Sequence, residues 1–329
     1  MNTIRDVGIV GTGHYVPEKV MTNSDLEKLV DTTDEWIFQR TGMRARRVAA
    51  EHEACSDLCI NAAKSALEDA GMEAAEIQMI IVATVTPDYM LPNTAALVQD
   101  RLGATQAGGW DVTNACTGFL SAFMAAQGMI AAGIIDNALV IGAEVLSSIL
   151  NYQDRASCIL FGDGAGAMIL KAGAERGRAL HLTSGLDGKQ WEAIQRNAGG
   201  SREPLSHPII EERRHLMSLK GRDVFKFAVN KFRHLINTSL EETQHTTADL
   251  ALVVPHQVNQ RIIEAACGKL NIEMDRVYIN LDRFGNTSAA SVPIAFDEVK
   301  RAGRLKEGDL ISMVAFGAGL AWGSALIRW

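Results

Sequence analysis

The segment Ile80-Ile-Val-Ala-Thr-Val-Thr-Pro87 has a counterpart at Leu250-Ala-Leu-Val-Val-Pro-His-Gln257, and each reads as a buried strand that ends in a proline-containing turn. A polar residue that opens a helix of small residues lies 36 positions after the start of each segment: Cys116 after Ile80, and Asn286 after Leu250. Order and spacing that repeat along a chain are the mark of internal duplication. The sequence therefore predicts two related halves.

Short apolar runs that read as strands alternate with helical patterns along the whole chain. The predicted strands are 79–85, 110–113, 138–142, 250–254, 277–281 and 310–316, and glycine- and alanine-rich strands at 162–170 and 322–329 close the two halves. This alternation is typical of an α/β protein with largely buried strands. We expect a first domain at residues 1–174 and a second at residues 175–329.

Composition limits the class of protein. The chain has 329 residues, is 47% hydrophobic and carries a net charge of −7, which argues against a general nucleic-acid binder. Residues 115–135 carry no formal charge, but they are rich in alanine, glycine and serine, so we expect a deeply buried helix rather than a membrane span. The N-terminus has no pattern of a signal peptide. Five scattered cysteines, without the paired spacing of a zinc site, indicate a reduced, cytoplasmic protein.

Two glycine-rich patterns are interpreted as tight turns rather than nucleotide sites. Gly11-Thr-Gly13 follows a strand, but Val16 and Pro17 replace the helix and third glycine of a dinucleotide site. Gly162-Asp-Gly-Ala-Gly166 lacks the lysine and hydroxyl residue of a phosphate loop.

A candidate nucleophile, Cys116, lies at a turn where a predicted strand passes into an apolar helix. The segment reads Trp110-Asp-Val-Thr-Asn-Ala-Cys-Thr-Gly-Phe-Leu-Ser-Ala122. Unpaired N–H groups at a helix start favour a thiolate, so the position predicts a lowered pKa for Cys116. A buried, unreactive cysteine is the alternative. His256 and Asn286 also have structural interpretations, as a core histidine and a helix cap. If the two halves pack about a pseudo-twofold axis, the three residues converge, and a nucleophile lies beside two neutral hydrogen-bond donors.

At these residues the chain resembles the β-ketoacyl-acyl-carrier-protein synthase III family of the thiolase superfamily. The segments that carry the resemblance are Asn114-Ala-Cys-Thr-Gly118, Phe161-Gly-Asp-Gly-Ala-Gly166, Val254-Pro-His-Gln-Val-Asn259, Phe284-Gly-Asn-Thr-Ser-Ala289 and Phe316-Gly-Ala-Gly-Leu-Ala-Trp-Gly-Ser324. They span the chain in order. The resemblance implies a thiolase-like fold, with duplicated α/β halves in an α-β-α-β-α arrangement of layers.

The resemblance also implies a reaction. Cys116 takes an acyl group from acyl-CoA, malonyl-acyl-carrier-protein then loses CO2, and the enolate attacks the acyl-cysteine to give 3-ketoacyl-acyl-carrier-protein. His256 and Asn286 are expected to donate hydrogen bonds to the enolate oxygen, and the backbone N–H groups of Cys116 and Ala318 to hold the other oxyanion. No metal or cofactor is expected. The family further implies a homodimer, in which Leu91 reaches the partner's acyl pocket.

Binding of the CoA donor is expected at two groups of residues. Thr32-Thr-Asp-Glu35 reads as a capping box, and the helix after it places Trp36 and Arg40 on one face, where an indole can stack on adenine and an arginine can meet a phosphate. A half-buried surface aromatic is the alternative for Trp36. By resemblance, the nucleotide contacts are Trp36, Arg40 and Arg155, and the tunnel for phosphopantetheine is lined by Gly221, Phe225 and Asn259.

A basic segment is the candidate dock for the acidic carrier protein. Between Arg213 and Arg233 the chain has seven lysines and arginines against one acid, Asp223. Helical spacing places Arg222, Lys226 and Arg233 on one stripe, which Arg261 is expected to extend. A solvated charged face is the alternative.

Several other functions share parts of this pattern. The nearest is a starter-unit condensing enzyme of a polyketide, quinolone or olefin pathway, because acyl choice depends on pocket shape. A thiolase is disfavoured, since it would want a second cysteine where this chain has Ala318. A non-catalytic scaffold that binds acyl carriers and a Cys-His-Asn hydrolase are the remaining alternatives.

Overall fold

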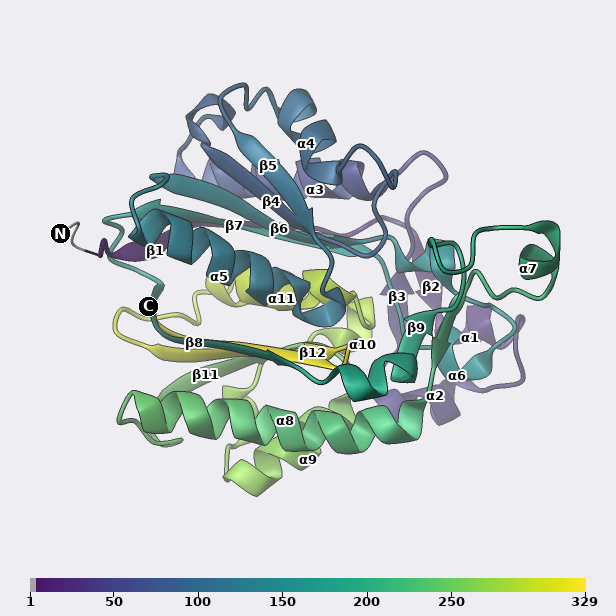
Figure 1. The fold of residues 1–329 in the computed structure, drawn as a ribbon. Helices are drawn as coiled ribbons and strands as arrows, with labels where there is room; N and C mark the ends of the chain where they lie inside the picture. Colours follow the sequence, from purple (N-terminus) through teal and green to yellow (C-terminus); the bar gives the residue numbers. More distant parts are fainter. Residues whose placement is uncertain (1–3) are drawn as a thin grey trace.

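Two β-sheets and three layers of helices alternate through the molecule (Figure 1). The computed structural model describes residues 4–329, except for the side chains of Arg222 and Asp223. The first sheet has the order β1 (Val7–Tyr15), β7 (Gly164–Ala172), β6 (Asn137–Glu144), β4 (Met79–Ala83) and β5 (Gly108–Val112). The second has the order β8 (Arg178–Leu186), β13 (Ala321–Arg328), β12 (Leu310–Gly317) and β11 (Leu250–Pro255).

Strand directions show that the two sheets follow one plan. In the first sheet β7 is antiparallel to both β1 and β6, whereas β4 is parallel to β6 and to β5. In the second, β13 is antiparallel to both β8 and β12, and β11 is parallel to β12. The place that β5 takes in the first sheet is taken in the second by one parallel bridge between Val253 and Val277. Val277 forms this bridge, but residues 278–281 of the strand predicted at 277–281 are not in a strand. That part of the prediction is therefore wrong.

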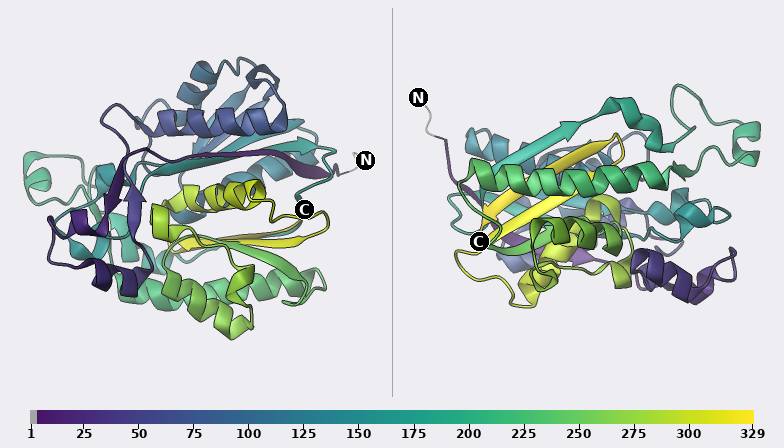
Figure 2. Two further views of the ribbon diagram at one scale, coloured as in Figure 1. Left: turned by 180° about the vertical axis from the view of Figure 1, so that it is seen from behind. Right: turned by 90° about the horizontal axis from the view of Figure 1, so that it is seen from below.

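Helices cover both faces of each sheet and give the five layers α-β-α-β-α (Figure 1). The outer layers are α3 (Cys55–Ala70) with α4 (Thr94–Leu102), and α8 (Gly221–Glu242) with α9 (Gln260–Leu270). The middle layer is α5 (Gly118–Ala131) with α11 (Ser291–Arg301), seen between the sheets from behind in Figure 2. The uncharged segment at 115–135 thus contributes α5 to the main apolar core. Within the described chain, no helix is both long and apolar enough to cross a bilayer.

Shorter elements complete the chain. The α-helices are α1 (Asn23–Leu26), α2 (Asp34–Thr41), α6 (Arg155–Cys158), α7 (His207–Glu211) and α10 (Leu281–Phe284), and the small strands pair as β2 (Val20–Thr22) with β3 (Ala45–Arg47) and β9 (Ile194–Arg196) with β10 (Met217–Leu219). The 3-10 helices are η1 (Ala74–Glu76), η2 (Ala115–Thr117), η3 (Leu146–Ile149), η4 (Gly188–Ala193), η5 (Met274–Arg276) and η6 (Ser288–Ala290). The domain boundary expected at 174/175 falls between β7 and β8, the last strand of one sheet and the first of the other.

Both glycine patterns predicted to be turns lie largely in strands instead. Gly11 and Gly13 are inside β1, and a Cβ atom on Gly13 would lie 2.4 Å from the backbone nitrogen of Ala66 in α3. Gly166 is inside β7, where a Cβ atom would lie 2.6 Å from the nitrogen of Ile294 in α11. These glycines let helices pack closely on the sheet, which is a requirement that local sequence does not distinguish from a turn.

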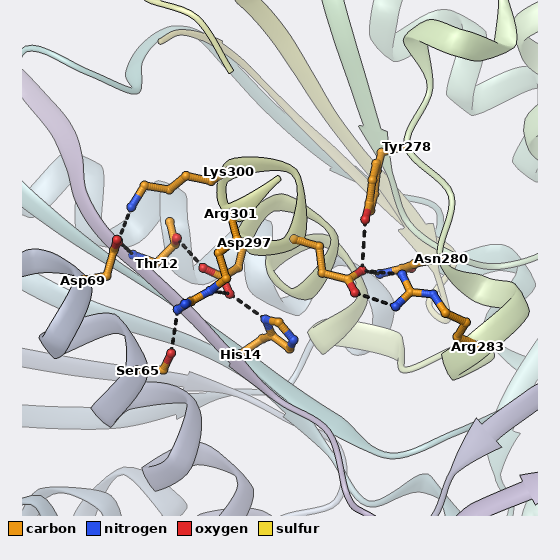
Figure 3. A network of polar contacts seen from close by, with 11 residues as sticks. Thr12, His14, Ser65, Asp69, Tyr278, Asn280, Arg283, Asp297, Lys300 and Arg301 are labelled. Atoms are coloured by element: carbon orange, nitrogen blue, oxygen red, sulfur yellow. Dashed lines mark hydrogen bonds and ion pairs between the residues drawn. The ribbon is translucent and has the colours of Figure 1, made fainter. Parts of the chain in front are cut away.

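A buried polar network joins the middle layer to the first sheet (Figure 3). The carboxylate of Asp297, in α11, accepts a hydrogen bond from the Thr12 hydroxyl at 2.6 Å and lies 2.5 Å from Nδ1 of His14, both in β1. It also accepts from Nε of Arg301 at 2.7 Å. Beside this group, Lys300 pairs with Asp69 of α3. Because β1 and α11 come from the two ends of the chain, the network links the two halves.

Candidate active site

Cys116 lies in η2, between the end of β5 and the start of α5. Ala115 turns the chain there with φ of 45°, in the left-handed region. The Cys116 side chain is 9% exposed, and burial raises the pKa of its thiol to about 12, against the opposing effect of the Ser288 hydroxyl. The lowered pKa predicted from the helix start is therefore wrong, because loss of hydration outweighs the backbone N–H groups.

The backbone after β12 approaches this cysteine closely. A Cβ atom on Gly317 would lie 2.7 Å from Cβ and 3.0 Å from Sγ of Cys116, so only glycine fits. Ala318 follows directly and shares the lining of one cavity with Cys116. Ala318, predicted to supply an oxyanion donor, therefore lies at the same cavity as the thiol.

His256 follows the last residue of β11, and its backbone N–H donates to the Val314 carbonyl at 2.7 Å. Its side chain is fully buried, with the edge of the ring against Phe316 at 5.9 Å between centroids. Nδ1 lies 2.7 Å from the Ser291 hydroxyl oxygen, whereas Nε2 has no hydrogen-bond partner among the described residues. Burial lowers the pKa of His256 to about 3, so the ring is neutral near pH 7.

Asn286 is held by its backbone and by its own side chain. Its N–H donates to the Leu160 carbonyl at 2.8 Å, and its carbonyl accepts from the Gly162 N–H at 3.0 Å. Oδ1 accepts a hydrogen bond from the Ser288 backbone N–H at 2.8 Å. Because the amide oxygen is occupied in this way, the Nδ2 hydrogens are the ones left to donate to a bound molecule.

One cavity of about 290 Å³ brings the three residues together. Cys116, His256 and Asn286 line it, as do Gly221, Phe225 and Asn259, which were predicted for the tunnel. Most of its remaining wall is apolar and was missed by the sequence analysis: Val85, Leu146, Ile149, Ile194, Met217, Leu219 and Ile262. Several of these come from η3, β9 and β10, which are too short to show a periodic pattern.

Trp36, Arg40 and Arg155 form a cluster beside the cavity rather than in its lining. The guanidinium carbons of Arg40 and Arg155 lie 5.3 and 4.8 Å from the centre of the Trp36 ring. Asn259 joins this cluster to the cavity wall, because its Nδ2 donates to the Arg40 carbonyl at 3.0 Å. The arrangement places a flat aromatic surface and two cations within reach of one bound group.

The helix that carries Trp36 begins one residue later than predicted. The cap of α2 is Thr33, whose hydroxyl oxygen accepts from the Trp36 N–H at 3.1 Å. The predicted capping box from Thr32 to Glu35 is therefore wrong, although a threonine still caps the helix. The Thr32 hydroxyl is buried and has no hydrogen-bond partner in the part of the chain that the structure describes.

The other predicted positions lie outside the cavity lining. Leu91 is 88% exposed and does not line the cavity of its own chain. Lys226 and Arg261 are exposed and adjoin the lining residues Phe225 and Ile262, whereas Arg233 is half-buried, and the side chain of Arg222 lies outside the described residues. Three other cations of the segment already have partners within the chain. Arg214 forms an ion pair with Glu203 and Lys220 with Glu192, and Lys231 lies over the ring of Trp322.

Comparisons with known proteins point to the same family in both halves of the chain. The family model described as 3-oxoacyl-[acyl-carrier-protein (ACP)] synthase III matches residues 110–188, and the model for the C terminal of the same synthase matches residues 240–329. The chain is 48% identical to the β-ketoacyl-[acyl-carrier-protein] synthase III of Desulfitobacterium hafniense, over 98% of each chain.

Solved structures share the fold over the same length. The 3-oxoacyl-[acyl-carrier-protein] synthase III of Aquifex aeolicus matches with a TM-score of 0.91 and 41% identity, covering 98% of this chain and all of that one. The priming β-ketosynthase of a polyketide biosynthetic pathway matches with a TM-score of 0.92 and 32% identity, covering 100% of this chain and 98% of that one. These matches include both segments that hold Cys116, His256 and Asn286.

Proposed function

The chain belongs to the β-ketoacyl-[acyl-carrier-protein] synthase III family, the initiating condensing enzymes of type II fatty-acid synthesis, and we propose that Cys116, His256 and Asn286 carry out its reaction. The observation that carries this assignment is their convergence in one mainly apolar cavity: Cys116 follows β5 in the first half, and His256 after β11 and Asn286 between α10 and η6 come from the second.

In the first half-reaction, the Cys116 sulfur attacks the acyl-CoA carbonyl and CoA leaves as the thiol. The backbone N–H groups of Cys116 and Ala318 hold the oxyanion that forms. The close approach of Gly317 to Cys116 supports this role. Trp36, Arg40 and Arg155 bind the nucleotide end of CoA, and Gly221, Phe225 and Asn259 line the path of its pantetheine arm.

In the second half-reaction, malonyl-acyl-carrier-protein enters and loses CO2. The resulting thioester enolate carries negative charge on oxygen, which His256 and Asn286 stabilise with hydrogen bonds. Two observations support these roles. His256 is neutral and its Nε2 has no hydrogen-bond partner among the described residues. The Oδ1 of Asn286 already accepts a hydrogen bond from the Ser288 N–H. The enolate carbon then attacks the acyl-cysteine carbonyl, which releases 3-ketoacyl-acyl-carrier-protein and the Cys116 thiol.

The carrier protein docks on the basic surface beside the cavity, at Lys226 and Arg261, with Arg222 and Arg233 on the same helix. The enzyme works in the cytoplasm as a homodimer, and the exposed apolar side chains of Met90 and Leu91 support a protein interface there. Light scattering of the purified protein tests the dimer.

Intact-mass spectrometry tests the function directly. The enzyme is offered a mixture of acyl-CoAs and then malonyl-acyl-carrier-protein. We expect a single acyl adduct on Cys116, which disappears as ketoacyl-carrier forms. Release of free acid instead would indicate a hydrolase, and no adduct would indicate a non-catalytic scaffold. The acyl group that is preferred distinguishes fatty-acid initiation from the priming step of a polyketide pathway.

A further inference from the structure

Asp163 is a fully buried carboxylate that the reaction described above does not use. Its Oδ1 accepts a hydrogen bond from the Ser147 backbone N–H at 2.9 Å. Its Oδ2 accepts from the Ser147 hydroxyl at 2.5 Å and from the Ala49 N–H at 2.8 Å. The backbone N–H of Asp163 donates to the carbonyl of Arg47, the last residue of β3, at 2.9 Å. Asp163 is therefore fixed to the end of β3 and holds Ser147 from there.

The carboxylate lies where two paired strands end and their chains separate. The pairing of β6 with β7 includes Glu144 with Gly164, the last residue of one strand and the first of the other. Beyond this pair, the chain that leaves β6 enters η3, and Asp163 is the residue directly before β7. The hydrogen bonds from Ser147 to Asp163 therefore link the two chains by a side chain, past the point where the strands end.

These two chains supply much of one wall of the cavity. Leu146 and Ile149 lie on either side of Ser147, and Phe161 lies two residues before Asp163. Phe161 also forms a parallel bridge with Asn286. Six residues of a single apolar cluster line the cavity with Cys116, and we call them the apolar wall: Val85, Leu146, Ile149, Leu160, Phe161 and Met217.

The hydrogen-bond donors around Asp163 require a carboxylate. Three donors converge on its two oxygens, and an ionised aspartate accepts at both. An asparagine has one acceptor oxygen and an NH2 group in place of the other. In either orientation of the amide, this NH2 group would face a backbone N–H, that of Ser147 or that of Ala49. The N–H would lose its acceptor in a buried place, which is unfavourable.

We propose that Asp163 is a positioning residue that sets which acyl groups Cys116 accepts, because it holds the apolar wall in place. A hydrocarbon chain on Cys116 lies in a mainly apolar cavity of about 290 Å³, against side chains of this wall. A fixed wall gives the cavity one size, so acyl groups of different length are bound unequally. Asp163 is not among the lining residues and acts through Ser147. This role rests on the proposed function.

Competition between acyl-CoAs tests the role of Asp163. The full chain is mixed with equal amounts of straight-chain acyl-CoAs, from acetyl-CoA to decanoyl-CoA, and intact mass gives the share of each adduct on Cys116. We expect the wild type to favour one chain length. In Asp163→Asn, the preference for this length over its neighbours in the series should fall about 10-fold, because the wall yields to other chains. Equal adduct shares in the two proteins would overturn the proposal, as would a wild type without any preference.

Asp297→Asn is the matched control, because Asp297 is also a fully buried carboxylate, is held by several hydrogen bonds and does not line the cavity. It joins α11 to β1 rather than two chains of the apolar wall. Its adduct shares should equal those of the wild type even though urea unfolding shows a loss of stability. A change of adduct shares in Asp297→Asn as large as in Asp163→Asn would mean that Asp163 has only a general structural role.

Hydrogen exchange gives a second measurement, without any acyl substrate. The peptide that covers η3 should exchange about 10-fold faster in Asp163→Asn than in the wild type, because Ser147 loses its anchor. Unchanged exchange in η3 would contradict the proposal. Ser147→Ala provides the test if Asp163→Asn does not fold. It removes one donor and keeps the carboxylate, so both readouts should change in the same direction by a smaller factor.

The results separate this inference from the proposed function. If the wild type forms no adduct with any acyl-CoA, the proposed function is rejected, and exchange in η3 still shows whether Asp163 holds Ser147. If the wild type forms adducts and Asp163→Asn forms them in the same proportions, the role of Asp163 alone is rejected.

Discussion

Nδ1 of His256 and the hydroxyl oxygen of Ser291 lie 2.7 Å apart in a fully buried contact. The single hydroxyl proton of Ser291 has two acceptors in reach, Nδ1 of His256 and the Ser288 carbonyl at 2.9 Å. If the proton points to Nδ1, the ring carries its own proton on Nε2 and can donate into the cavity. The proposed role of His256 requires this arrangement, in which the Ser291 hydroxyl holds the tautomer that carries its proton on Nε2.

Replacing Ser291 with alanine should therefore slow condensation and leave acylation unchanged. We expect a loss of roughly 10- to 100-fold in condensation, as for other partners that orient a functional histidine. Single-turnover measurements separate the two half-reactions. Ser312→Ala is the control, because Ser312 is a buried hydroxyl in β12 that does not line the cavity. Equal loss in both half-reactions would show that Ser291 has only a structural role.

Asn286→Ala and His256→Ala should each still take an acyl group onto Cys116 but fail to decarboxylate malonyl-acyl-carrier-protein. Removal of one donor to a developing oxyanion costs about 100-fold or more in kcat. Mass spectrometry of the adduct and release of CO2 from labelled malonyl-carrier measure the two steps. Cys116→Ser should abolish acylation. If His256→Ala lost acylation as completely as condensation, the separation of roles between Cys116 and His256 would be wrong.

The duplicated plan was readable in the sequence because each repeated strand is long enough to show a continuous apolar run. The same plan explains one residue at the site. Gly317 is the last residue of β12, the strand equivalent to β6, and its backbone lies against Cys116. Composition alone did not show this, because a glycine at a strand end has meaning only once the halves are packed together.

The failed predictions share a cause. Gly13 reads as a turn because nothing local reveals α3 crossing above it, and the raised pKa of Cys116 depends on burial that no neighbouring residue reports. The cavity wall from β9 and β10 has only three-residue strands, which are too short for a period to appear. Local sequence predicts elements, whereas close approach and dehydration are properties of the assembled layers.

Trp36→Ala should raise the KM for acyl-CoA about 10-fold, because stacking of a base on an aromatic ring contributes about 1–3 kcal/mol. The rate at saturating acyl-CoA should change little. Steady-state kinetics with acyl-CoA as the varied substrate measure the effect. Arg44→Ala is the control, since Arg44 stacks on Phe38 rather than on Trp36. An unchanged KM in Trp36→Ala would remove Trp36 from the nucleotide site.

Lys226→Glu combined with Arg261→Glu should raise the KM for malonyl-acyl-carrier-protein at low salt, and added salt should reduce the difference from wild type. Acylation from acyl-CoA should not change. Lys269→Glu reverses a charge near the other end of α9 and is the control. Lys226 is in α8 and Arg261 is in α9, and these two helices lie next to each other (Figure 2, right). An unchanged carrier KM in the double variant would reject this surface as the dock.

Asp297→Asn should destabilise the fold by about 2 kcal/mol, because it leaves His14 and Arg301 without their carboxylate. The cost is below that of a fully buried pair, since Arg301 is half-exposed.

Hydrogen bonds from His14, Thr12 and Arg301 hold the pKa of Asp297 below its usual value despite burial. A lowered folded-state pKa stabilises the fold above the unfolded value of 3.8, and this contribution is lost as the pH falls through the folded-state pKa. Urea unfolding should therefore show the full difference between wild type and variant at pH 7 and a smaller one at pH 3. Asp136→Asn, which breaks the exposed pair with Arg5, should cost less than about 1 kcal/mol at either pH. A difference for Asp297→Asn that does not shrink in acid would mean that its shape, rather than its charge, joins β1 to α11.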